Sequence, residues 1–352
     1  MSKKHFSALL LVTVVVAVLV LLVPGKTSKE SSFQKHLLLP GLAALVNEID
    51  YVQVSGAGGE TIATLNRREG KWLVAESFDY LANWPVLRQL LSDLAVAEVV
   101  EGKTSNPKFY SRLGVQDMAS PEASGVQIGF TRETGLSSVI VGNKAQGREG
   151  QYVRLSGARQ SLLIDRVLIV PGDMQQWLGR EIIDIQEGEL VEVSIRHPDN
   201  EQILLLKVSA DDTDFELQKI PEGREILSHW TVNSIAGGLV SLTLDAVVPE
   251  SEIDWTDAVQ IRFLAADGLR VSAQLVSAQE QFWISLRASA DQAADFGEST
   301  NADPESEGVP GLTERLRRIN DRVSAWAYAI PRHKAEVMTK RMDDLLNPLE
   351  AE

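Results

Sequence analysis

The sequence predicts an α+β protein, in which an N-terminal transmembrane helix precedes two duplicated lobes of mainly antiparallel sheet with packed helices. Three observations predict it. An uncharged apolar run opens the chain, short segments with period-two alternation of apolar residues follow between helical segments, and one such segment recurs in the second half. With 44% hydrophobic and 24% charged residues among 352, the composition is that of an ordinary globular chain.

The charge and the cysteine content exclude several classes of function. The chain carries 49 acidic against 34 basic residues, a net charge of −15, whereas a nucleic-acid-binding protein needs clustered Lys and Arg. We therefore expect no nucleic-acid partner. The absence of cysteine excludes disulfides, thiolate zinc sites, iron–sulfur clusters, a cysteine nucleophile and a lipid-modified cysteine.

Residues 1–25 are interpreted as a cytoplasmic stub and a transmembrane anchor. No side chain from Phe6 to Val23 is charged, and a helix of this length, roughly 27 Å at about 1.5 Å per residue, just spans a bilayer core of about 30 Å. A cleaved signal peptide is the alternative. Its apolar core is usually about 7–15 residues long and ends in a small-x-small cleavage site, which this sequence does not have. We expect the segment to stay attached.

The orientation follows from what stands on each side of the anchor. Five residues precede it, whereas residues 26–352 hold all 49 acidic and 32 of the 34 basic residues. Lysines flank the span on both sides, but a large domain is translocated largely regardless of its charge. The sequence predicts a single-pass protein of the bacterial inner membrane, with a cytoplasmic N-terminus and a periplasmic C-terminal domain.

Residues 26–47 are interpreted as a tether with a short apolar helix at 37–47, and residues 48–184 as the first α+β repeat. Asn83 as N-cap and Pro85 in the first turn predict a helix there. We expect its apolar face to contain Trp84, Leu87, Leu91 and Leu94. Period-two patterns predict strands at 51–54, 62–65, 72–74, 95–100, 126–130, 138–141, 152–155 and 162–165, and residues 174–178 are predicted as a helix.

The order of these elements recurs in the second half. Val126–Phe130, followed by Gly135-Leu136, has a counterpart in Val259–Phe263 and Gly268-Leu269. Further landmarks recur in the same order: Val52/Val54 with Val191/Val193, Trp84 with Trp230, Val99-Val100 with Val247-Val248, and Tyr152–Arg154 with Trp283–Arg287. The recurrence predicts a second α+β repeat at residues 189–348 with the topology of the first.

The second repeat carries an acidic insertion at 289–311. It has six acids and no Lys or Arg, a composition typical of a disordered loop. After it we expect a short helix at 312–319, a strand at 323–330 with Trp326, Tyr328 and Ile330 on one face, and a closing helix at 332–346.

Several core and turn residues together resemble a known family. They are Gly70–Val74, the helix residues Leu87, Leu90, Leu91 and Leu94, Tyr110-x-x-Leu113-Gly114, Tyr152-Val153-Arg154, and Asp343–Leu346. With the N-terminal anchor, this pattern resembles the bacterial domain-of-unknown-function 4340 family over most of residues 48–348. The resemblance implies a membrane-anchored envelope protein, whose genes commonly accompany ABC-type transport systems with gliding-motility-like auxiliary subunits. It supplies no catalytic residue, and the acidic insertion departs from the family pattern.

Three glycine- or serine-containing segments have a chemical and a structural interpretation, and the structural one is favoured. Gly102-Lys103-Thr104 resembles the end of a phosphate-binding loop, but Ala97 stands where the first glycine belongs. Gly56–Gly59 lacks the third glycine of a dinucleotide fingerprint, so we expect a hairpin turn. Ser105–Lys108 has serine–lysine spacing without the companion motifs and is predicted as a loop.

Metal ligands are the next candidates. Asp211, Asp212, Asp214 and Glu216 could present oxygens to calcium, but the segment lacks the glycine and the closing carboxylate of a calcium loop. A solvated hairpin tip is favoured. The five histidines, His5, His36, His197, His229 and His333, form no i, i+4 pair, so a metal or serine–histidine site would have to be assembled by the fold.

The seven tryptophans invite a carbohydrate-binding interpretation, because aromatic faces stack on sugars. Each of five lies on an apolar stripe and is predicted in the core: Trp72, Trp84, Trp177, Trp230 and Trp326. Trp255 and Trp283 are left open. A binding cleft between the lobes is kept as an alternative.

The leading hypothesis is a non-enzymatic, membrane-anchored periplasmic accessory protein that contacts an ABC transporter or its auxiliary subunit. No local spacing places a nucleophile beside a base, so we assign no catalytic, cofactor-binding or metal-binding residue and expect no cofactor. The rival hypothesis is an envelope ligand-binding or hydrolytic protein that acts on glycan or peptide in a cleft between the lobes.

Overall fold

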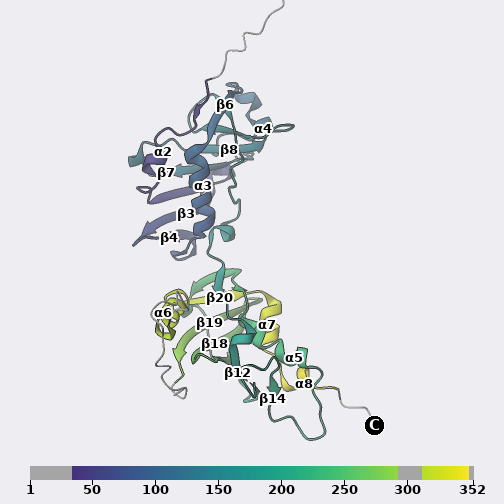
Figure 1. The fold of residues 1–352 in the computed structure, drawn as a ribbon. Coiled ribbons are helices and arrows are strands. Elements are labelled where there is room, and N and C mark those ends of the chain that lie inside the picture. The colour runs from purple at the N-terminus through teal and green to yellow at the C-terminus, as the bar shows by residue number, and fades with distance from the viewer. Residues whose placement is uncertain (1–33, 292–310, 349–352) are drawn as a thin grey trace, which may run out of the picture.

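The computed structural model describes residues 34–291 and 311–348, which form two lobes arranged end to end (Figure 1). Each lobe is built on an antiparallel sheet, of ten strands in the first lobe and eight in the second. The predicted α+β class is confirmed. The predicted anchor, Phe6–Val23, lies outside the described residues. Within them, no helix is both long enough and apolar enough to cross a membrane.

The sheet of the first lobe runs in the order β5-β4-β3-β2-β7-β8-β9-β10-β6-β1. Its strands are β1 (His36–Leu37), β2 (Tyr51–Ser55), β3 (Thr61–Arg68), β4 (Lys71–Val74), β5 (Tyr80–Leu81), β6 (Glu98–Gly102), β7 (Val126–Phe130), β8 (Val139–Lys144), β9 (Gln151–Leu155) and β10 (Ser161–Ile164). Two meanders, β2–β5 and β7–β10, meet where β2 pairs with β7. The strands predicted in this lobe are therefore present, with β6 starting later than expected.

Helix α3 (Trp84–Val96) packs against this sheet, as predicted. The Asn83 side chain caps it by accepting a hydrogen bond from the Val86 amide at 3.5 Å. Leu87, Leu91 and Leu94 are buried against the strands, so most of the predicted apolar face is confirmed. The helix continues to Val96, which shortens the strand that was expected at 95–100. A second short helix in this lobe, α4, covers Tyr110–Leu113.

Three predicted helices are shorter than expected. Within 37–47, only Leu42–Leu45 is helical (α2), because the residues before it form strand β1 along β6. The helix expected at 174–178 is a single 3₁₀ turn, Met174–Trp177. The closing helix breaks after Met338 into α7 (Arg332–Met338) and α8 (Met342–Leu345).

The sheet of the second lobe runs in the order β14-β13-β12-β17-β18-β19-β20-β16. Its strands are β12 (Leu190–Arg196), β13 (Gln202–Leu206), β14 (Glu216–Leu217), β16 (Ala246–Pro249), β17 (Val259–Ala265), β18 (Leu269–Ala278), β19 (Gln281–Ala290) and β20 (Trp326–Ile330). Helix α5 (His229–Asn233) lies between β14 and β16 in the chain. Helix α6 (Leu312–Val323) is longer than predicted, so β20 starts at Trp326 rather than at 323. Residues 292–310 of the acidic insertion lie outside the described residues.

The two sheets have the same strand order. Outward from β2 and β12, strands β3-β4 match β13-β14, and β7-β8-β9-β10-β6 match β17-β18-β19-β20-β16. The register corrects two of the predicted pairs. Leu162 faces Gly102 as Tyr328 faces Val247, so Val247 corresponds to Gly102 rather than to Val99. Val52 faces Phe130 as Val193 faces Phe263, so Val52 corresponds to Val193 rather than to Val191. The duplication itself stays a prediction, which a superposition of the two sheets tests.

The lobes meet through aromatic side chains and a short backbone connection. Tyr80 of β5 packs edge-to-face on Trp326 and Tyr328 of β20, with ring centroids 5.1 and 6.0 Å apart. The connecting chain forms a small sheet of β11 (Glu181–Ile183) with β15 (Leu242–Thr243). Most of the buried apolar residues of both lobes belong to one continuous cluster, so the junction is part of the core.

Candidate binding cleft between the lobes

A cavity of about 800 Å³ opens at the junction and is lined by both lobes. The first lobe contributes residues from β3, β4, β5 and the start of α3, the connecting chain contributes the start of β11, and the second lobe contributes the end of α6. The lining residues are Asn47, Arg67, Gly70, Trp72, Tyr80, Leu81, Ala82, Asn83, Trp84, Pro85, Gly179, Arg180, Glu181 and Arg322. We call this cavity the interlobe cleft. Its volume falls in the range of small-molecule sites, about 300–1,000 Å³.

Aromatic side chains form one side of the interlobe cleft. Trp72 and Tyr80 are buried, at 7% and 1% exposure, whereas Trp84 is 46% exposed at the first position of α3. Burial raises the pKa of the Tyr80 hydroxyl, so this group is neutral at physiological pH. The start of α3 is held in place by the backbone, because the Asn83 amide donates to the Trp177 carbonyl oxygen at 2.6 Å.

The charged groups of the interlobe cleft are three arginines and one glutamate. Arg322 donates to Glu181 at 2.9 Å, and Arg180 donates to Asp245 at 3.0 Å. Arg67 donates to the backbone oxygen of Asn47 at 2.6 Å, and no carboxylate of the described residues lies within ion-pair distance of it. The lining therefore has an excess of positive charge in a chain whose net charge is −15.

Arginine, aromatic and amide side chains make up most of the polar and aromatic lining of the interlobe cleft. Among the described residues that line the interlobe cleft, Glu181 is the one carboxylate, and none is histidine, serine or lysine. General acid–base catalysis needs a matched pair of titratable groups within hydrogen-bond reach of the substrate. Guanidinium and aromatic groups instead recognise negative charge and flat or ring-shaped surfaces.

The tryptophan assignments are partly confirmed. Trp72 and Trp177 are buried, as predicted, Trp326 is half-buried against the core, and of the two left open Trp283 is buried and Trp255 half-buried. The core assignment is wrong for Trp84 and Trp230, which are 46% and 79% exposed. Both stand in the first turn of a helix, Trp84 in α3 and Trp230 in α5.

The three glycine- or serine-containing segments are structural. Gly102 ends strand β6, and the amides of Lys103 and Thr104 donate to the oxygens of Ser161 rather than forming an open phosphate cradle. Gly56–Gly59 forms the predicted turn between β2 and β3. Ser105–Lys108 is a loop with a 3₁₀ turn capped by Asn106.

The acidic loop and the histidines form no metal site. Asp212 and Asp214 accept hydrogen bonds from the Ser209 amide and the Asn233 side chain, at the tip of the β13–β14 hairpin. His36, His229 and His333 are exposed at separate places and His197 is buried, while His5 lies outside the described residues. Over 34–291 and 311–348, no group of three His, Asp or Glu side chains could hold a metal ion.

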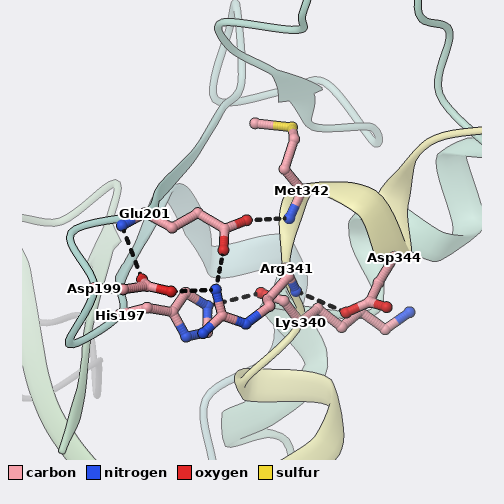
Figure 2. Close-up of polar contacts among 7 residues, drawn as sticks. All are labelled: His197, Asp199, Glu201, Lys340, Arg341, Met342 and Asp344. Atoms are coloured by element: carbon pink, nitrogen blue, oxygen red, sulfur yellow. Dashed lines mark hydrogen bonds and ion pairs between the residues drawn. The ribbon is translucent and has the colours of Figure 1, made fainter. Parts of the chain in front are cut away.

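Another polar cluster lies at the outer end of the second lobe, between the β12–β13 turn and α8 (Figure 2). The Arg341 guanidinium binds Asp199 at 2.8 Å and also binds Glu201, while the Met342 amide donates to Glu201 at 2.7 Å. The Glu201 amide, first, and then Arg341 lower the pKa of Asp199. Each carboxylate already has a cation and a backbone donor as partners, so we interpret the cluster as a fastening of α8 to the sheet.

The family-like residues around Arg154 also form a structural cluster. The Arg154 side chain is 2% exposed and donates to the backbone oxygens of Val115 and Ala158, each at 2.8 Å, and to Asp117 at 2.5 Å. The Tyr110 ring lies 4.6 Å from its guanidinium carbon. Arg154 therefore joins the segment after α4 to strand β9.

The sequence offers a cleft between the lobes as an alternative, but it does not indicate the arginines that line the cleft. Arg67, Arg180 and Arg322 are separated by more than a hundred residues from one another and share no local spacing. Only the docking of the lobes brings them together. One local signal was available at Trp84, because a residue between an N-cap and a proline stands at a helix end, where side chains often leave the core.

The comparisons with known proteins give a family and no function. The model of one family, described as Domain of unknown function (DUF4340), matches residues 72–261, from strand β4 into strand β17. No curated protein and no solved structure matches the chain.

Proposed function

We propose that this chain, which belongs to the DUF4340 family, is a non-enzymatic, membrane-anchored periplasmic accessory protein of an ABC-type transport assembly. The family model carries no function of its own. The proposal therefore rests on the chain's residues, above all on Trp230. We infer that a protein partner binds the surface around this side chain.

Trp230 is the observation that carries the proposal. It is 79% exposed on α5, and Leu227, three residues earlier, is 50% exposed. Tryptophan is rarely left this exposed without a partner, and it is enriched among the residues that dominate binding energy at protein interfaces. We call Leu227 and Trp230 the α5 surface.

The position of the α5 surface fits an anchored protein. The described chain enters at the outer end of the first lobe, whereas α5 lies towards the opposite end of the molecule, in the second lobe (Figure 1). The α5 surface is therefore far from the point at which the described chain begins.

The α5 surface is also firmly supported. The Leu227 amide donates to the Leu345 carbonyl oxygen of α8 at 2.7 Å, and Arg224 binds Asp343 at 3.2 Å. Helix α8 is in turn held by Arg341 (Figure 2). A surface that is already ordered loses little conformational entropy on binding, which favours affinity.

Crosslinking in intact membranes, followed by purification of the full-length chain, tests the proposal. We expect subunits of an ABC transporter to be captured by the wild type, and their capture to fall about tenfold or more with Trp230→Ala, the effect typical of an interface hot spot. Val208→Ala is the matched control, because Val208 is 77% exposed on another loop. Equal capture by Trp230→Ala and the wild type would contradict the role of the α5 surface.

The anchor is tested separately by N-terminal sequencing of the protein from the membrane fraction. An intact N-terminus is expected, because the segment has no cleavage site. A mature chain that starts near Lys26 would contradict it.

A second candidate function is the binding of an envelope ligand, glycan or peptide, and the interlobe cleft favours it. Its size and aromatic lining are those of a ligand site. Ligand binding in the cleft and partner binding at the α5 surface use different residues, so variants at the two places distinguish them.

A further inference from the structure

We propose that the interlobe cleft binds an acidic saccharide, with the sugar carboxylate between Arg67 and Arg322 and a sugar ring against Trp84. This inference deepens the second candidate function and is independent of the partner at the α5 surface. It rests on the charge of the lining, on the exposed aromatic surface and on the size of the cavity.

Arg67 supplies the first cation. Its guanidinium uses a backbone oxygen, that of Asn47, and no described carboxylate neutralises it. Arg67 is half-buried in the cavity wall and keeps its positive charge there, because a guanidinium is not deprotonated in proteins. A carboxylate in the cleft can accept a charge-assisted pair of hydrogen bonds from this planar group.

Arg322 supplies the second cation, because its guanidinium can exchange the Glu181 carboxylate for a carboxylate of the ligand. Its ion pair with Glu181 has side-chain exposures of 39% and 65%, and a pair exposed to this degree contributes little to stability. A ligand carboxylate can therefore replace Glu181 at little cost. Glu181 then acts as a competitor for the site, which gives a variant with an expected gain of affinity.

Trp84 and Asn47 supply the contacts for the sugar itself. The half-exposed indole lines the cleft at the start of α3, and the buried Trp72 also lines it. The C–H groups of a sugar ring pack on such an aromatic face, and an amide suits its hydroxyls. Asn47 lines the cleft, whereas the side chain of Asn83 is engaged in capping α3 and in donating to the Gln176 oxygen. A cavity of about 800 Å³ has room for several sugar rings.

Isothermal titration of the full-length chain, in a detergent without a sugar headgroup, tests the proposal. The probe is tetragalacturonate, xylotetraose is the neutral comparison, and galactose 1-phosphate tests for phosphate recognition. We expect tetragalacturonate to bind more tightly than both and to weaken as salt is added, because the contact is between charges. Equal binding of xylotetraose, tighter binding of the phosphate, or no binding of tetragalacturonate would overturn the proposal.

Variants of the lining locate the binding. We expect Arg67→Gln and Trp84→Ala each to raise the Kd by about tenfold, the effect of losing one strong contact, and Glu181→Gln to lower it. Arg67→Lys keeps the charge and is expected to restore part of the affinity. Trp230→Ala is the control and leaves the Kd unchanged. Unchanged affinity in a folded Arg67→Gln protein would overturn the assignment of the cleft, whatever the result of the membrane capture.

Discussion

The two lobes share a strand order, but the connection that covers the sheet is long in the first lobe and short in the second. In the first lobe, residues 103–125 connect β6 to β7 and cover a face of the sheet, with their own small cluster of Tyr110, Val115, Met118 and Ile140. In the second lobe, the corresponding connection is short, residues 250–258, and Trp283 packs there with alanines of β20.

The register shows how single positions adapt to this difference. Arg154 pairs with Ile140 in the first sheet, and Ser285 pairs with Gln274 in the second. Because Ile140 and Gln274 occupy the same register position in their sheets, Arg154 and Ser285 correspond. By the same register, Gly142 corresponds to Val276. In the first lobe, the buried Arg154 holds the long polar connection against the sheet, and this leaves no room for a side chain at Gly142 on strand β8. In the second lobe, the short connection leaves room at the corresponding position, which Val276 occupies.

Removal of the Arg154 side chain is expected to have the largest effect and tests this difference between the lobes directly. We expect Arg154→Ala to lower the free energy of unfolding by about 3 kcal/mol, because two backbone oxygens lose a charged donor and the Tyr110 ring loses its partner. Ser285→Ala, at the corresponding place, is expected to cost less than about 1 kcal/mol. Urea unfolding measures both values. Similar losses in the two variants would show that the lobes are fastened alike.

Adding a methyl group under the long connection tests the same idea by steric means. A Cβ at Gly142 would stand 2.2 Å from the Leu113 oxygen, so Gly142→Ala is expected to cost about 1–3 kcal/mol. Val276→Ala in the second lobe only removes half-buried methyl groups, and we expect a smaller loss of about 1 kcal/mol. Thermal unfolding of both variants checks the order. A neutral Gly142→Ala would contradict the close passage of the connection.

The two exposed tryptophans allow α3 to be compared with α5, the helix that the sequence recurrence matches to it. Trp84→Ala is expected to lower stability by about 1 kcal/mol, because half of its surface is buried at the junction. Trp230→Ala is expected to change stability by less than about 0.5 kcal/mol, since most of its surface is already in water. Denaturant unfolding compares them. A large loss in Trp230→Ala would mean that this side chain serves the fold rather than a partner.

Acid titration is expected to weaken the start of β6 more than the start of β16, by the smallest of these effects. A hydrogen bond from Arg166 lowers the pKa of Asp165, and Asp165 in turn accepts the Glu98 amide at 3.0 Å. A lowered pKa adds stability that is present above the usual value of about 3.9 and is lost as pH falls through the folded value. The register places Pro331 at the corresponding position of the second lobe, where no group titrates.

Hydrogen exchange with mass spectrometry measures this effect. Between pH 5 and pH 3, after correction for intrinsic rates, we expect peptides with the start of β6 to lose protection and those with the start of β16 to change less. Asp165→Asn removes the difference between the two pH values. Equal loss in both lobes would locate the acid sensitivity elsewhere.

The sequence predicted the fold well wherever a local pattern decides the structure. Alternating strands, the Asn83 cap and the recurrence of Val126–Phe130 in Val259–Phe263 are such patterns, and the strand orders agree with them. Helices 37–47 and 332–346 were too long, because pairing of β1 with β6 and the fastening at Arg341 depend on distant residues. The arginines that line the interlobe cleft could not be predicted for the same reason, since they meet only when the lobes dock.

The shared strand order has a consequence for how the chain folds. Two sheets with the same order of eight strands in one molecule invite the exchange of strands, a characteristic failure of proteins with repeated units. In the first lobe, β6 precedes β7–β10 in the sequence, so every strand of that sheet has been synthesised before β12 begins. The order of synthesis thus protects each lobe from pairing with the other. A circular permutant that begins in the middle of the first lobe loses this protection, because part of that sheet then emerges only after the second lobe is complete.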